Sequence, residues 1–222
     1  MQIDLSAKPT LEAAYQIAVA AHEGQVRKYS GTPYISHPME VVEILNDAGV
    51  TGQRILAAGL LHDVLEDTTY PAHLLRERVG SVVLGLVESL TNKDRGTRAQ
   101  KNAAAIKRIV AASKHAQMVR LADVIHNLSD VADHDPAFAA IYLEEKKALL
   151  DALPLSYRTT DRQYEYLWER ARESYTKGLE KVALHQLKRG QALNDQLMVG
   201  EEDISRMIAD EELASMQAAA MF

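Results

Sequence analysis

Helical periodicity runs through almost the whole chain and is the feature that most constrains its fold. Apolar residues recur three and four positions apart from Leu11 to about Leu187, and no run of alternating β-branched residues is bounded by hairpin turns. With 222 residues, 47% of them hydrophobic, the chain has ample material for a buried core. We therefore predict an all-α fold.

Two of the predicted helices are apolar on nearly all sides, yet each carries one polar seam. In the segment 53–67 the seam consists of His62, Asp63, Glu66 and Asp67. In the segment 116–131 it consists of Asp123, His126, Asn127 and Asp130. An apolar helix is normally buried, and buried ionisable groups are retained when they are paired or bind a metal. The seams therefore predict a polar site inside the domain.

A divalent metal ion is one explanation for the seams. His37, at the start of the second predicted helix, could join His62, Asp63 and Asp123. Two imidazoles and two carboxylates suit Mn²⁺, Fe²⁺, Zn²⁺ or Mg²⁺. Because the chain has no cysteine, thiolate ligands and disulfides are excluded. Adjacent residues on a regular helix point about 100° apart, so one ion between His62 and Asp63 requires a position against the helix flank or a local distortion.

The order of these residues matches a known signature. His37, then His62-Asp63, then Asp123 resembles the HD phosphohydrolase superfamily, whose fold is a compact helical domain. Four short sequence motifs narrow the resemblance to the RelA/SpoT hydrolase domain, over about residues 11–153. The motifs are AHEGQVRK (21–28), PYISHP (33–38), LLHDVLEDT (60–68) and LADVIHN (121–127).

The resemblance implies Mn²⁺-dependent removal of the 3′-pyrophosphate from ppGpp or pppGpp, with ppApp as a further substrate, giving a nucleotide and pyrophosphate. It implies metal ligands at His37, His62, Asp63 and Asp123. It implies an acid–base pair at Glu66 and Asp67, and nucleotide contacts from Arg27, Lys28 and Asn127. The chemistry is consistent, since a carboxylate one turn beyond the ligands can take a proton from water.

Departures from the family pattern leave the base preference open. Val124 stands where the family commonly has arginine, and Leu128-Ser129-Asp130 replaces a basic stretch after Asn127. Another HD-type nucleotide phosphohydrolase is the first alternative, and it would not need Arg27 and Lys28. A non-catalytic nucleotide sensor is the second alternative.

Several other polar residues are interpreted as structural. His22 is expected to end a helix, and His126 is placed to hydrogen-bond a metal ligand. Solvated surface is the expected location of Lys93, Arg98, Lys101 and Asn102.

We expect one hydrolase domain over residues 1–190. Residues 191–222 are predicted to form a helical extension that could pack on the domain or on a second copy of the chain. A formal net charge of −6 argues against nucleic-acid binding. No apolar run reaches the length of a membrane span, and the N-terminus does not resemble a signal peptide. These features predict a cytoplasmic protein, and the resemblance implies a small-molecule nucleotide substrate.

Overall fold

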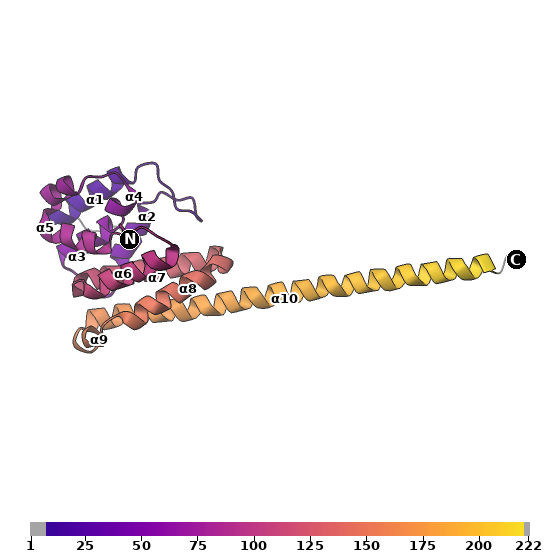
Figure 1. Ribbon diagram of the computed structural model, residues 1–222. Helices are drawn as coiled ribbons and strands as arrows, with labels where there is room; N and C mark the ends of the chain where they lie inside the picture. Colours follow the sequence, from indigo (N-terminus) through magenta and orange to yellow (C-terminus); the bar gives the residue numbers. More distant parts are fainter. Residues whose placement is uncertain (1–7, 220–222) are drawn as a thin grey trace. The chain divides into compact units, whose positions relative to one another are not determined.

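The computed structural model describes the backbone of residues 8–219 and the side chains of residues 8–191. In this part of the chain the elements are helices, apart from one isolated antiparallel bridge between Val26 and Pro33. The helices are α1 (Pro9–Ala21), α2 (Ser36–Asp47), α3 (Gln53–Leu61), α4 (Val64–Asp67), α5 (Ala72–Leu90), α6 (Arg98–Ala111), α7 (Lys114–His134), α8 (Pro136–Ala152), α9 (Leu155–Thr160) and α10 (Arg162–Ala219). Figure 1 shows their arrangement, which confirms the all-α prediction.

The chain divides into two units, residues 1–179 and residues 180–222. Helix α10 begins in the first unit and continues through the backbone of the second as far as Ala219. The side chains of the predicted extension, 191–222, lie almost wholly outside the described residues. The predicted boundary at residue 190 therefore stays a prediction. None of the helices in the described residues has the length and apolar character needed to cross a membrane.

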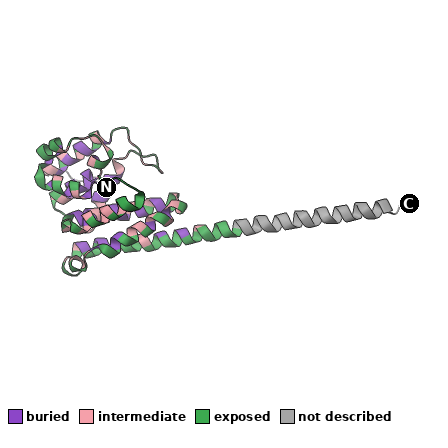
Figure 2. Ribbon diagram, in the orientation of Figure 1, coloured by how far each residue is buried: buried purple, intermediate pink, exposed green. Residues whose placement is uncertain are grey.

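Helix α3 forms the centre of the first unit, where it contacts α1, α2, α5 and α7 (Figure 1). All its residues from Leu56 to Leu61 are buried, in agreement with its lack of a polar face (Figure 2). Gly59 lets α2 approach closely, because a Cβ atom there would lie 3.1 Å from Leu45 and 3.2 Å from Val42. The helix that carries His37 is thus packed tightly against the helix that leads to His62.

The predicted single helix over 53–67 is interrupted at two residues. Helix α3 ends at Leu61 and α4 begins at Val64, so that His62 and Asp63 lie in the break. Nδ1 of His62 donates a hydrogen bond to the carbonyl of Gly59 at 2.8 Å. The prediction of an unbroken helix is wrong here, and the break is the local distortion that would let His62 and Asp63 share an ion.

Proline and glycine set two further features of the helices. Helix α1 starts at Pro9, because proline suits the first position of a helix. Helix α5 is kinked at Gly80, where φ is 86°.

The start of α10 closes the core of the first unit. Tyr164, Leu167, Trp168 and Ala171 are buried, and the Tyr164 hydroxyl donates to the buried Gln117 side chain at 2.8 Å. Further along α10, Leu179 is 41% exposed whereas Val182 is buried.

Candidate active site

Two helices and the α3–α4 break bring the predicted metal ligands together. Candidate ligand atoms of His37 on α2, His62 in the break and Asp123 on α7 all lie within 4.8 Å of one another, and all three residues are buried. Oδ2 of Asp63 lies 3.5 Å from Nε2 of His37 and 3.1 Å from Nε2 of His62. We call these four residues the ligand cluster.

The electrostatics of the ligand cluster favour a positive charge at its centre. Burial opposes ionisation of Asp63, but His62 and His37 together outweigh it and hold the pKa of Asp63 well below its usual range. Burial likewise opposes ionisation of Asp123, but the neighbouring imidazoles of His37 and His62 lower its pKa. Burial also opposes charge on His62, yet Asp63 and Asp123 raise its pKa. Two imidazole nitrogens and two carboxylates with these properties fit a divalent cation.

Asp123 is held by two further side chains. Oδ2 of Asp123 accepts a hydrogen bond from Arg120 at 2.9 Å, and Oδ1 accepts one from the Asn127 amide at 2.6 Å. Arg120 also donates to the carbonyl of Leu90 at 2.6 Å, which anchors the guanidinium between α5 and α7. The orientation of Asp123 is therefore determined by neighbours on its own helix.

Glu66 and Asp67 lie one helical turn beyond the break, on α4. Oε2 of Glu66 accepts a hydrogen bond from the backbone N–H of Asn92 at 2.6 Å. The Tyr34 hydroxyl donates to Oδ2 of Asp63 at 2.6 Å and contacts Oδ2 of Asp67 at 3.2 Å. Burial is the main cause that raises the pKa of Glu66 and of Asp67, with the Asp63 carboxylate adding to both. Carboxyl groups tuned in this way are suited to proton transfer.

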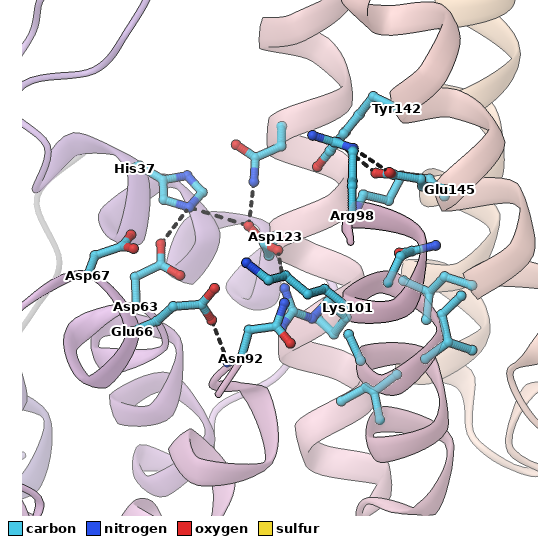
Figure 3. Close-up of a pocket in the computed structure, with 18 of the residues that line it drawn as sticks. His37, Asp63, Glu66, Asp67, Asn92, Arg98, Lys101, Asp123, Tyr142 and Glu145 are labelled. Atoms are coloured by element: carbon cyan, nitrogen blue, oxygen red, sulfur yellow. Dashed lines mark hydrogen bonds and ion pairs between the residues drawn. The ribbon is translucent and has the colours of Figure 1, made fainter. Parts of the chain in front are cut away.

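These groups open into one cavity of about 570 Å³. Figure 3 shows Asp63, Glu66 and Asp67 on one wall, with Arg98 and Lys101 on the other. Asn102 and Lys146 also line it. A cavity with acidic groups on one side and cations on the other can hold a phosphorylated ligand next to the ligand cluster.

Arg98 and Lys101 are exposed, as expected, and together with the half-buried Asn102 they also line the cavity. Arg98 forms a bidentate ion pair with Glu145, with distances of 2.5 and 2.8 Å. Lys93, which was expected at the surface with them, is exposed. The sequence spacing gave no sign of the cavity wall, because α6 and α8 meet the ligand cluster only through tertiary packing.

The three predicted nucleotide contacts are found in different surroundings. Arg27 is largely buried, and its guanidinium donates to Asp130 at 2.6 Å and to Oδ1 of Asn127 at 3.2 Å. Both Arg27 and Asn127 line the cavity. The side chain of Lys28 is 71% exposed and lies 3.4 Å from Asp135, away from the residues that line the cavity.

Tyr34, Arg120 and Lys146 are among the cavity residues that were not identified from the sequence. Tyr34 stands three positions before His37 and Arg120 three before Asp123, so a helical-spacing search around each ligand could have found them. Lys146 on α8 had no such signal. Burial, followed by the charge of Arg120, lowers its pKa to about 8.

Both histidines interpreted as structural have defined contacts. His22 follows the end of α1, where it is buried, stacks on Tyr34 at 4.6 Å and pairs with Gln25 at 2.8 Å. Nδ1 of His126 lies 2.9 Å from Nδ1 of His37. The expected hydrogen bond between His126 and a candidate metal ligand is therefore present.

Comparison with known proteins yields consistent matches over this unit. The family model described as HD domain matches residues 14–148. A GTP pyrophosphokinase of Streptomyces coelicolor is 41% identical over 132 residues, which are 57% of this chain and 15% of that protein. The chain thus corresponds to a small part of that relative.

Two animal proteins correspond to the chain more completely. Human guanosine-3′,5′-bis(diphosphate) 3′-pyrophosphohydrolase MESH1 is 37% identical over 123 residues, which cover 54% of this chain and 68% of MESH1. A solved structure described as a metazoan ortholog of SpoT that hydrolyses ppGpp matches with a TM-score of 0.65 and 30% identity. The match covers 76% of this chain and 96% of that structure.

Proposed function

The chain belongs to the HD domain family, in the group that includes MESH1, and we propose that it hydrolyses the 3′-pyrophosphate of ppGpp and related alarmone nucleotides. The observation that carries this proposal is the shared cavity, in which the ligand cluster, Glu66 and Asp67 face Arg98 and Lys101. A substrate with phosphates at two positions needs both a reaction centre and separate cations to bind its remaining charge.

We propose Mn²⁺ as the ion held by His37, His62, Asp63 and Asp123. The convergent, buried nitrogen and oxygen donors support a divalent ion, and the family resemblance favours manganese. Such an ion supplies Lewis acidity toward a phosphoryl oxygen and lowers the pKa of water.

The residues of the chain then have separate tasks in the hydrolysis. The bond between the ribose O3′ and its phosphorus breaks, oxygen from water leaves in pyrophosphate, and O3′ gains a proton. Glu66 and Asp67 are placed to accept the proton from water and to deliver one to O3′. Tyr34 and the Asn92 backbone hold these two carboxyl groups by hydrogen bonds. Arg98, Lys101 and Lys146 would neutralise phosphate charge on the opposite wall.

A different nucleotide substrate is the second candidate, and one observation favours it. Lys28 lies outside the cavity lining, and Arg27 is already paired with Asp130, so neither residue presents an unpaired charge to a guanosine alarmone. An HD enzyme acting on ordinary nucleotides would not depend on them. In that case Arg27→Ala would leave turnover nearly intact, whereas the alarmone proposal expects a clear loss.

The deciding experiment is an activity assay of the purified chain with Mn²⁺. The protein is incubated separately with ppGpp, ppApp and nucleoside triphosphates, and the products are resolved by anion-exchange chromatography. We expect pyrophosphate release from an alarmone that a chelator abolishes. Cleavage of ordinary nucleotides alone would retain the phosphohydrolase chemistry but refute the alarmone assignment. A metal-loaded protein that cleaves nothing would favour the nucleotide-sensor alternative.

We further propose that the protein acts in the cytoplasm on free nucleotides. Its net charge of −6 does not favour a nucleic-acid substrate. Self-association through residues 191–222 stays a prediction, which the mass of the protein in solution would test.

A further inference from the structure

A hydrogen-bonded chain leads from the ligand cluster to the protein surface. It begins at His37, passes through His126 and ends at the carboxylate of Glu40, which accepts a hydrogen bond from Nε2 of His126. The side chain of His126 is 14% exposed and that of Glu40 is 51% exposed. The same two helices that provide His37 and Asp123 provide the chain, because Glu40 follows His37 by three residues and His126 follows Asp123 by three.

The chemistry of each partner determines where the hydrogen atoms lie. An ionised carboxylate only accepts hydrogen bonds, so Nε2 of His126 must carry the hydrogen in its bond to Glu40. In a neutral imidazole the other nitrogen, Nδ1 of His126, is then an acceptor. Nδ1 of His37 lies 2.9 Å away and must donate to it. Nε2 of His37 is left with its lone pair.

That lone pair faces the ligand cluster. Nε2 of His37 lies 3.1 Å from Nε2 of His62 and 3.4 Å from Oδ1 of Asp123. A neutral His62 also has its lone pair on Nε2, because its Nδ1 donates a hydrogen bond to the carbonyl of Gly59. In their neutral forms both imidazoles therefore present an Nε2 lone pair to a cation, but only His37 depends on a side-chain relay to do so.

We propose that Glu40 acts through His126 as a positioning residue that sets the tautomer of His37 and strengthens metal binding. The proposal rests on the metal site within the proposed function and adds to it two residues outside the ligand cluster. Partners of this kind typically change metal affinity by about 10-fold to 100-fold when they are removed.

The test is a titration of chelator-treated protein with Mn²⁺ alone, in which isothermal titration calorimetry measures the Kd. Glu40→Ala is expected to raise the Kd for Mn²⁺ about tenfold, and His126→Ala about 10-fold to 100-fold. Glu40→Gln keeps an acceptor oxygen for His126 and should bind nearly as well as the wild type. Asp47→Asn is the matched control, since Asp47 is exposed near the end of the same helix and its change removes the same charge.

A double-mutant cycle separates a relay from two independent effects. If the chain acts as a unit, Glu40→Ala will have no further effect once His126 is changed to alanine. If His126→Ala fails to fold, His126→Asn replaces it, because the asparagine amide can still accept from His37 but cannot bridge to Glu40. A further tenfold loss in the double variant, or an unchanged Kd in Glu40→Ala, would overturn the relay.

The same titration distinguishes this proposal from the proposed function. Asp123→Ala removes a member of the ligand cluster and should abolish high-affinity binding. If the wild-type protein and Asp123→Ala bind Mn²⁺ alike, the metal site itself is wrong. If only Asp123→Ala loses binding while both relay variants bind normally, the metal site stands and the relay fails.

Discussion

The hydroxyl of Tyr34 lies 2.6 Å from Oδ2 of Asp63, and the same oxygen reaches Asp67 at 3.2 Å. One phenol thus links a candidate metal ligand to a candidate acid–base residue. A hydrogen bond donated to a carboxylate stabilises its ionised form. The bond from Tyr34 therefore lowers the pKa of Asp67, whereas burial and the Asp63 carboxylate raise it.

Tyr34→Phe is therefore expected to raise the pKa of Asp67 and to reduce kcat/KM about 10-fold to 100-fold. If Asp67 must be ionised for turnover, the acid limb of the pH–rate profile will move to higher pH. Tyr166→Phe is the control, since Tyr166 is an exposed residue of α10. An unchanged profile in Tyr34→Phe would show that the phenol has no part in proton transfer.

Glu66→Gln should slow hydrolysis by about two to four orders of magnitude, the usual contribution of positioned acid–base catalysis. The amide keeps the shape of the side chain and an acceptor for the Asn92 N–H, so Mn²⁺ affinity should not change. Turnover and the Kd for Mn²⁺ are measured in parallel, with the exposed Glu88→Gln as control. Equal rates for Glu66→Gln and the wild type would remove Glu66 from the mechanism.

Lys146→Met should raise KM for the alarmone and stabilise the folded protein at pH 7. Burial lowers the pKa of Lys146 to about 8, so protonation disfavours the folded state below that pH, and this penalty disappears as pH rises toward the unfolded value. Methionine keeps the apolar stem of the side chain but removes the ammonium, which lies 4.5 Å from the centroid of the Tyr142 ring. A lost phosphate contact corresponds to about a tenfold increase in KM. Thermal unfolding at pH 7 tests the predicted stabilisation, and steady-state kinetics test the predicted rise in KM. A lower Tm with an unchanged KM would contradict both predictions.

Asp161→Asn should make the thermal stability of the folded protein vary less with pH in the acid range. Asp161 pairs with Lys114 and caps the start of α10 through the backbone N–H groups of Gln163 and Tyr164. Its hydrogen bond from Lys114 is the main cause that lowers the pKa of Asp161. The resulting stabilisation is present above the unfolded pKa of about 3.9 and is lost as pH falls through the folded value.

Asparagine retains the cap but not the charge. We expect Tm to fall by about 2–4 °C at pH 7, as for the loss of about 1 kcal/mol. The Tm values of the variant and the wild type should converge as pH falls through the lowered pKa of Asp161, since Asp161 is then protonated. Thermal unfolding followed by circular dichroism from neutral to acid pH measures the difference, which should shrink toward the acid end. A difference that stays constant across this range would mean that charge plays no part.

Local spacing made the helices and the ligand cluster predictable from the sequence. The i, i+3 and i, i+4 patterns define apolar helices with one polar seam each, and only a buried polar site accounts for them. The break at His62 and Asp63 was foreseeable only as a requirement of shared ion binding, since nothing in the sequence ends the helix at Leu61.

Tertiary packing determined what the sequence could not provide. Arg98, Lys101 and Lys146 have no helical-spacing relation to the ligand cluster, and they reach the cavity because α6 and α8 pack beside α7. Arg27 and Lys28 are adjacent in sequence, but the bend around the Val26–Pro33 bridge directs one into the cavity and the other toward Asp135. Which of two neighbouring basic residues enters a site is a property of loop geometry.

Side chains of the protein donate hydrogen bonds to both carboxylates of the ligand cluster. Asp63 accepts from Tyr34, and Asp123 accepts from Arg120 and Asn127, so the fold itself offsets part of the cost of their burial. Small zinc domains, in contrast, remain unfolded until their ion arrives. The domain of this protein should therefore fold first and bind its metal ion afterwards. Exchange of one divalent ion for another then needs no unfolding, and the ion that occupies the protein in a cell will follow local supply.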